Sequence, residues 1–199
     1  MKILIPMAGK GKRFEDAGYS FPKPLIDING KPMIQIIIEN LNFPAEHIFL
    51  CQKEHSEKYS LKELLDFISP NCKIVQVKGI TEGAACTALL AKELINNDEE
   101  LIIANSDQWV DWNNQHFLSY LRNNDASGGI VTFIATHPKW SFVKINDKND
   151  NEFICSVLDK YSDVVYKAGV SIPHDERVNW LRLTVGPGLH QQKFISLCL

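Results

Sequence analysis

The sequence predicts an α/β fold, a three-layer sandwich with a mostly parallel central sheet. From residue 2 to about residue 122, short apolar runs alternate with segments whose apolar residues recur at helical spacing. Such alternation is typical of a parallel sheet with helices on both faces. The length of 199 residues suits one sizeable core better than two full domains. We therefore expect a single domain over residues 1–199, with a change of pattern near residue 126.

The first half, residues 1–125, contains four predicted strands, each a short apolar run bounded by turn residues. They are Lys2–Pro6, His47–Cys51, Lys73–Val77 and Leu101–Ala104. Four helices are predicted between or after them, from apolar residues three and four positions apart. They are Pro32–Leu41, Glu54–Ile68, Gly83–Ile95 and Asn114–Arg122. Residues Leu25–Ile28 alternate into Asn29-Gly30, a strong turn signal.

The second half, residues 126–199, has a different pattern with three predicted strands in succession. They are Gly129–Ala135, Phe142–Ile145 and Glu152–Leu158, the last two joined by a turn at Asn146–Asn151. Residues Gly169–Leu199 show no clear amphipathic period, so no element is assigned there. This part of the chain is atypical for the pattern of the first half, and we interpret it as divergent or truncated.

The composition excludes some classes of partner. A net charge of -3 gives no reason to expect nucleic acid or an anionic membrane. No apolar run approaches the roughly 20 residues of a membrane helix. The five cysteines are scattered without a C-x-x-C pair, which indicates reduced thiols in a cytoplasmic protein.

A glycine-rich basic loop follows the first predicted strand, in the stretch IPMAGKGKRFEDAGYSFPKPLI. Glycine allows close approach of backbone N–H groups to a phosphate, and Arg13 and Lys23 supply positive charge. The loop lacks the glycine that a dinucleotide fingerprint needs at Phe14, and it lacks a Walker A motif. A solvated turn is the alternative, but the preceding strand and Pro22-Lys23-Pro24 favour an anion site.

An acidic residue stands just beyond the fourth predicted strand, in LIIANSDQW. The carboxylate of Asp107 is expected at the same sheet edge as the glycine loop, where it could bind Mg2+ that also contacts phosphate. Taken alone, a helix cap or an Asx turn is the favoured explanation of Asp107. Asp111 is expected to cap the helix that follows.

The helix predicted at residues 83–95 begins with small residues, in TEGAACTALLAKEL. Gly83, Ala84 and Ala85 would let a flat base lie against backbone. Close helix–sheet packing with Thr81 as N-cap accounts for the same residues, and spacing alone leaves both interpretations open.

The motifs MAGKGKRF, FPKPLI and NGKPMI together resemble the opening of the sugar-phosphate nucleotidyltransferases. The resemblance covers roughly residues 1 to 160. It implies a Rossmann-like sheet of the nucleotide-diphospho-sugar transferase (GT-A-like) kind. It also implies Mg2+-dependent transfer of a nucleotidyl group from a nucleoside triphosphate to a phosphorylated acceptor, such as a sugar 1-phosphate, with release of pyrophosphate.

The resemblance also implies roles for individual residues. Those matched to nucleotide binding are Ala8, Gly9, Gly11, Lys12, Arg13, Lys23 and Gly83. Catalytic roles fall to Arg13 on the outer phosphates, Lys23 on the reacting phosphate and Asp107 as metal ligand. In SVLDK, Lys160 matches a lysine that contacts the acceptor phosphate, although the sequence alone favours a lone surface lysine.

Two other functions remain as alternatives at this point. A glycosyltransferase that consumes a nucleotide-sugar would typically show an Asp-x-Asp motif, which NSDQW lacks. A non-catalytic nucleotide-binding module would keep the nucleotide half, 1–125, and lack a working acceptor half, 126–199. Members of the family often serve capsule or envelope polysaccharide synthesis in the cytoplasm, and many form homo-oligomers, which the sequence leaves open here.

Overall fold

The computed structural model describes residues 1–9, 11, 14, 16–124, 128–131, 143–144, 154–156, 180–181 and 194–197. Its main feature is a six-stranded sheet in the order β5-β4-β1-β6-β11-β7. Every neighbouring pair in this sheet is parallel, which confirms the predicted α/β class. The strands are β1 (Lys2–Pro6), β4 (Glu46–Gln52), β5 (Lys73–Val77), β6 (Leu101–Ala104), β7 (Gly128–Ile130) and β11 (Phe194–Leu197).

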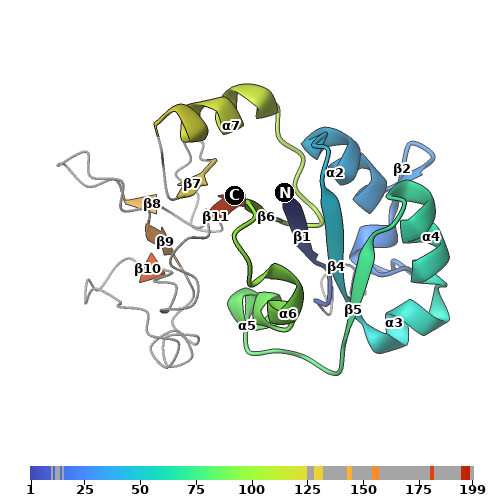
Figure 1. Cartoon of the computed structure of the whole chain (residues 1–199). Coiled ribbons are helices and arrows are strands. Elements are labelled where there is room, and N and C mark those ends of the chain that lie inside the picture. The colour runs from blue at the N-terminus through green and yellow to red at the C-terminus, as the bar shows by residue number, and fades with distance from the viewer. Residues whose placement is uncertain are drawn as a thin grey trace.

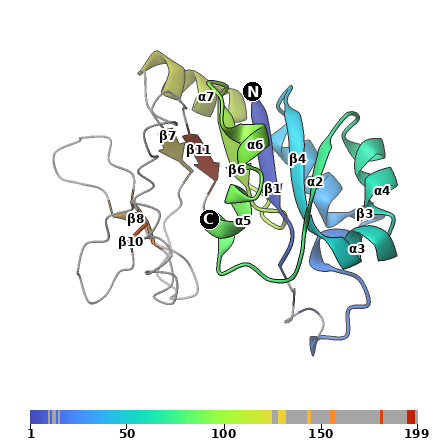
Figure 2. The same cartoon turned by 60° about the horizontal axis from the view of Figure 1, so that its bottom comes forward.

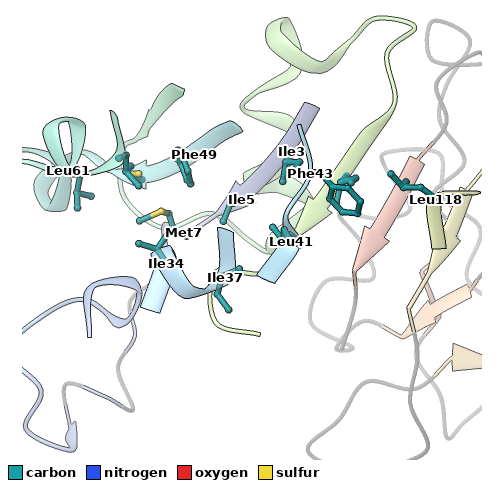
Figure 3. Packing of buried hydrophobic residues seen from close by; sticks show 14 of the residues in the cluster. Ile3, Ile5, Met7, Ile34, Ile37, Leu41, Phe43, Phe49, Leu61 and Leu118 are labelled. Carbon is teal, nitrogen blue, oxygen red and sulfur yellow. The ribbon is translucent and has the colours of Figure 1, made fainter. Parts of the chain in front are cut away.

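Helices cover both faces of this sheet because successive residues of its strands point to opposite sides. On one face, Ile3 and Ile5 of β1 pack with α2 (Met33–Leu41), α4 (Leu61–Ile68) and α7 (Asn114–Asn123) (Figures 1 and 3). On the other face, Leu4 packs with residues of α6 (Lys92–Ile95) and with Ala88 of α5 (Ala84–Leu89). The two clusters make the three layers that the sequence predicts.

The core on the α2 side is dense. Ile34 and Phe49 are fully buried, and Figure 3 shows them near Ile5 and Met7. Burying an aliphatic or aromatic side chain of this size stabilises the fold by roughly 1.5–3 kcal/mol. The apolar residues of α2, at positions 34, 37 and 41, are spaced to face this cluster, so α2 is fixed firmly on the sheet.

Two of the predicted helices are each divided in two. The segment predicted as Glu54–Ile68 forms α3 (Lys53–Lys58) and α4, because Ser60 has a left-handed backbone with φ 47°. The segment predicted as Gly83–Ile95 forms α5 and α6, with a break before Ala91. Ala91 and Ile95 are both buried against the second face, so packing there overrides the helical propensity of the alanine-rich sequence.

Asp111, predicted as a helix cap, and Thr81, considered as one, do not occupy the N-cap positions. The side chain of Asn113, not Asp111, accepts a hydrogen bond from the His116 N–H and caps α7. Gly83, not Thr81, stands at the N-cap of α5.

The predicted Asn29-Gly30 turn is confirmed. Both residues have positive φ, 54° and 83°, as a type I′ turn requires. The turn joins β2 (Asp27–Ile28) to β3 (Lys31–Pro32) in a two-stranded antiparallel sheet. Leu25, predicted to begin this segment, instead ends the 3-10 helix η1 (Lys23–Leu25).

The second half of the chain is described in part. β7, β8 (Val143–Lys144) and β9 (Ile154–Ser156) overlap the three strands predicted there. The predicted turn at Asn146–Asn151 lies outside the described residues. Two further strands, β10 (Trp180–Leu181) and β11, occur where the sequence shows no clear pattern. β8, β9 and β10 form an antiparallel sheet, whereas β11 lies between β6 and β7 in the large sheet (Figure 2).

The carboxyl ends of β1, β4, β5 and β6 meet at one edge of the large sheet. The register pairs Pro6 with Leu50, Gln52 with Val77, and Leu4 with Ile103, so these parallel strands end close to one level. Ligands of open parallel sheets bind at this edge. Among the described residues, no helix is both long and apolar enough to cross a membrane.

Candidate active site

Lys23 and Asp107 meet at the carboxyl edge of the sheet. The Lys23 Nζ forms an ion pair with Asp107 Oδ2. Asp107 is the third residue after β6, and Lys23 is the first residue of η1. The two side chains are 31% and 28% exposed, so the pair is partly sheltered and still open to a ligand.

A stiff turn determines where the Lys23 ammonium lies. Prolines 22 and 24 flank it, and the proline ring fixes φ at each of these positions. The Leu25 N–H donates to the Pro22 carbonyl at 2.8 Å, which closes η1. Pro24 is buried, and η1 packs against α2. The sequence Pro-Lys-Pro thus holds the lysine on a short, anchored segment.

The glycine loop contacts the same lysine. Lys23 Nζ lies 4.9 Å from the centre of the Phe14 ring, a cation–π geometry. Phe14 is linked to Gly11 because its N–H donates to the Gly11 carbonyl at 2.8 Å. Gly11 has φ +60°, and a Cβ there would lie 3.7 Å from the Lys23 Cβ. Phe14, which the sequence reasoning passed over, therefore connects the loop to Lys23.

Ala8 and Gly9 lie where β1 runs into the glycine loop. Ala8 is 8% exposed and packs in the core, and its carbonyl accepts a hydrogen bond from Gln52 Nε2 at 2.7 Å. Gly9 is exposed, and among the described residues no atom lies within 4 Å of a Cβ built on it. The backbone at Gly9 is thus open to a ligand. Gln52 was missed, although its place at the end of β4 could have indicated it.

Gly83 begins α5, which lies beside β1. Its carbonyl accepts the Thr87 N–H at 2.9 Å and the hydroxyls of Thr87 and Thr81 at 3.0 and 3.2 Å. Thr81 therefore supports the turn before α5 rather than capping the helix. These contacts hold the first turn of α5, and a base contact at Gly83 stays a prediction.

Asp107 could hold a divalent cation. A carboxylate is a hard oxygen ligand of the kind that Mg2+ and Ca2+ prefer. Asp107 binds Lys23 through Oδ2. Within the described part of the chain, no group of three His, Cys, Asp or Glu side chains surrounds a cation position. A cation on Asp107 would therefore share its coordination with ligand oxygens and water.

Three predicted site residues, Lys12, Arg13 and Lys160, lie outside the described residues. The structure brings Gly11 and Asp107 together at Lys23, whereas Ala8 and Gly9 follow β1 and Gly83 precedes α5.

The family model described as "Nucleotidyl transferase" matches residues 2–141, more than half of the chain. The chain belongs to the nucleotidyl transferase family. The matched range contains the glycine loop, Lys23, Gly83 and Asp107, and it ends before Lys160. The resemblance inferred from MAGKGKRF and FPKPLI is thus confirmed.

The chain is similar to curated proteins over part of their length. It is 32% identical over 121 residues to the bifunctional protein GlmU of Methanocaldococcus jannaschii, covering 60% of this chain and 28% of that protein. It is 23% identical over 215 residues to the mannose-1-phosphate guanyltransferase of Aspergillus oryzae, covering 100% of this chain and 56% of that protein. The chain spans only about a quarter to a third of the GlmU relatives that it matches.

Solved structures share the fold. A nucleoside-diphosphate-sugar pyrophosphorylase from Vibrio cholerae superposes with a TM-score of 0.61 at 18% identity, covering 98% of this chain and 91% of that one. A UTP-bound UGPase from Acinetobacter baumannii gives a TM-score of 0.55 at 18% identity, covering 80% and 67%. At such identities the likeness supports the Rossmann-like, three-layer fold.

Proposed function

We propose that this nucleotidyl transferase moves a nucleotidyl group from a nucleoside triphosphate to a phosphorylated acceptor, such as a sugar 1-phosphate. The single observation that carries the proposal is the ion pair between Lys23 and Asp107 at the carboxyl edge of the sheet, beside Gly11. It brings a phosphate-binding cation and a metal-binding carboxylate together next to an open glycine backbone. The name of one relative, mannose-1-phosphate guanyltransferase, agrees with this reaction class.

The glycine loop binds the triphosphate in this proposal. Backbone N–H groups near Gly9 and Gly11 approach the phosphate oxygens, because no Cβ stands in the way at either position. Arg13 is proposed to bind the outer phosphates through its planar guanidinium, and Ala8 and Lys12 are proposed to contact the nucleotide as well. Gly83, at the start of α5, contacts the nucleobase.

Lys23 neutralises charge on the reacting phosphate. Its ammonium already lies between the Phe14 ring and the Asp107 carboxylate, so little reorganisation is needed when a triphosphate binds. Transfers of this kind depend on positioning and charge neutralisation more than on covalent help from the protein.

Asp107 fits Mg2+, which proteins commonly hold through one or two carboxylates together with substrate phosphates. Bound there, Mg2+ would supply charge neutralisation at the α-phosphate. Asp107 provides the anionic ligand, and Lys23 limits how far its carboxylate can turn.

The acceptor needs no dedicated general base, because the second pKa of a phosphate monoester is near 6 and the group is mostly ionised at about pH 7. An acceptor oxygen attacks the α-phosphorus, the bond to the β-phosphate bridging oxygen breaks, and pyrophosphate leaves. Lys160 is proposed to contact the acceptor phosphate. The product, a nucleotide-activated metabolite made in the cytoplasm, would serve polysaccharide synthesis.

One assay tests the proposal. The protein is incubated with each nucleoside triphosphate, Mg2+ and a panel of sugar phosphates and other phosphorylated metabolites, and pyrophosphate is measured. Release that requires both a triphosphate and an acceptor is the expected result. Triphosphate binding without release would indicate a non-catalytic module, and the absence of triphosphate binding would refute the proposal.

A further inference from the structure

We propose that Asn40, near the C-terminal end of α2, is a positioning residue that holds the segment carrying Asp107 in place. The inference rests on the proposed function of Asp107 and adds a residue to it. Asn40 belongs to none of the motifs of the sequence, and its side chain hydrogen-bonds to the Val110 backbone.

The contact is a reciprocal pair of hydrogen bonds, called here the Asn40–Val110 clamp. Asn40 Nδ2 donates to the Val110 carbonyl at 2.8 Å, and the Val110 N–H donates to Asn40 Oδ1 at 3.0 Å. The Asn40 side-chain amide thus hydrogen-bonds to both the N–H and the carbonyl of Val110, as a residue of an antiparallel strand does with its partner. Because the amide is planar and uses both its ends, the clamp fixes the orientation of the Val110 backbone as well as its position.

A second contact anchors the same segment a little further on. The Trp112 Nε1–H donates to the Asn40 carbonyl at 3.4 Å. Its ring packs edge-on against Phe43, with centroids 5.8 Å apart, and also contacts Phe117. The segment is therefore held at residues 110 and 112 on one side of Asp107.

Asp107 lies midway between two fixed points. Ala104, the last residue of β6, is buried in the sheet three residues before it, and Val110 is held by the clamp three residues after it. Three residues reach at most about 10 Å when fully extended. Anchoring both ends of so short a segment limits the displacement of the Asp107 carboxylate.

The same helix also supports Lys23. α2 packs against η1, and the Met33 N–H at its start donates to the Ile26 carbonyl at 2.9 Å. Ile34, Ile37 and Leu41 fix α2 on the sheet. One rigid helix therefore holds η1 near its N-terminus and the Asp107 segment near its C-terminus, which sets the spacing between lysine and carboxylate.

Loss of the clamp should affect this spacing more than folding. Asn40 is half-buried and borders a surface cleft of about 380 Å3, which Trp109 and Asn42 also line. Water can reach the groups that its removal would leave unpaired. The energetic cost to the fold is accordingly modest, because exposed groups regain hydrogen bonds to solvent.

The test compares Asn40→Ala with Asn114→Ala in the full chain. Asn114 Nδ2 also donates two hydrogen bonds to the end of α2, to the carbonyls of Leu41 and Asn42 at 2.8 and 3.1 Å, but it makes none to residues 107–112. Both variants therefore lose side-chain bonds at the same helix end. The Asn40→Asp variant, which keeps an acceptor for the Val110 N–H, serves as the conservative change.

Four quantities are measured: the exchange rate of the Val110 amide hydrogen, kcat, the Mg2+ concentration for half-maximal rate, and triphosphate binding in EDTA. Exchange of the Val110 amide hydrogen, followed by NMR, should accelerate at least tenfold in Asn40→Ala and stay unchanged in Asn114→Ala. Residues that orient metal ligands typically change metal affinity or activity about 10–100-fold when removed. Asn40→Ala should therefore lower kcat and raise the Mg2+ concentration for half-maximal rate by about that factor. Triphosphate binding in EDTA should be unchanged, and Asn40→Asp should fall between wild type and Asn40→Ala.

The outcomes separate this inference from the proposed function. Unchanged Val110 exchange in Asn40→Ala would refute the clamp whether or not the protein is active. Faster exchange with an unchanged kcat and Mg2+ dependence would refute a positioning role. Absence of product from the native protein would overturn the proposed function, and the catalytic part of this inference with it, while the exchange data would still decide the clamp.

Discussion

The ammonium of Lys23 and the carboxylate of Asp107 form an ion pair although the two residues are 84 positions apart in the chain. The topology of the sheet accounts for the contact. β1 and β6 are parallel neighbours, so the segments that follow them leave the sheet at the same edge. η1, which carries Lys23, lies within the first of these segments.

Removing the Asp107 carboxylate should abolish most activity. Loss of a preorganised electrostatic partner of a reacting phosphate costs roughly 100-fold or more in rate, so we expect at least this loss for Asp107→Ala. Pyrophosphate release measures it, and circular dichroism should show an unchanged fold. Asp111→Ala is the matched control, because Asp111 is exposed and follows in the same segment. Equal losses in both variants would contradict the role of Asp107.

Replacing Lys23 should weaken triphosphate binding. A hydrogen bond to a charged group contributes about 1.5–3 kcal/mol, so the Kd of Lys23→Ala for the triphosphate should rise roughly tenfold or more. Titration calorimetry at two salt concentrations measures this, and the difference from wild type should shrink at high salt. Lys31→Ala, which breaks the exposed pair of Lys31 with Glu39, should leave the Kd unchanged. The prediction fails if Lys31→Ala weakens binding as much.

The left-handed backbone at Gly11 should be needed for binding. A left-handed conformation costs a residue with a Cβ about 1–2 kcal/mol, so Gly11→Ala should lower the free energy of unfolding and also reduce triphosphate affinity. Gly18 has φ +85° and lies in open space among the described residues, so Gly18→Ala has a similar backbone cost away from Lys23. Urea unfolding and calorimetry compare them. Equal affinities in the two variants would exclude a specific role of Gly11.

Acid should destabilise the fold through His47. Burial lowers the pKa of His47, whose ring is hydrogen-bonded to the Ser69 hydroxyl at 2.9 Å. The folded state therefore favours the neutral ring, and the unfolded chain binds more protons below its ordinary pKa of about 6.5. This contribution to the free energy of unfolding is complete above that pKa and decreases as the pH falls, by at most about 1.4 kcal/mol per pH unit.

Urea unfolding at pH 7.5 and pH 5.5 measures the effect of His47. His47→Gln should reduce the difference in unfolding free energy between the two conditions, whereas His116→Gln, at an exposed position, should not. An unchanged pH dependence in His47→Gln would show that other groups cause it.

Much of the sheet could be predicted because the central strands β1, β4 and β6 are largely buried and appear in the sequence as short apolar runs. Lys2–Pro6 and Leu101–Ala104 match β1 and β6 residue for residue. β11 could not be predicted, because the stretch Gly169–Leu199 that contains it shows no clear amphipathic period. Its place between β6 and β7 also depends on contacts with residues distant in the sequence. The break at Ser60 was missed because its flanking residues keep helical spacing across it.

Site residues that belong to a sequence motif could be predicted, whereas residues that only support them through contacts could not. Gly11, Lys23 and Asp107 are recognisable from residue type and their positions after strands. Phe14, Gln52 and Asn40 act through contacts to a ring, a carbonyl and a distant backbone, which have no local pattern in the sequence. Of these, only Gln52 stands at a strand end where the sheet topology would draw attention to it.

In the proposed reaction, a phosphorylated acceptor attacks the α-phosphorus of the triphosphate at the edge formed by Gly11, Lys23 and Asp107. The most direct measurement uses a triphosphate labelled at the α-phosphorus, with Mg2+ and the acceptor that gives pyrophosphate release. The account predicts that the label moves to the acceptor, that the pyrophosphate is unlabelled, and that Asp107→Ala abolishes the transfer. Label that remains in the triphosphate, or that appears in free nucleoside monophosphate regardless of acceptor, would contradict it.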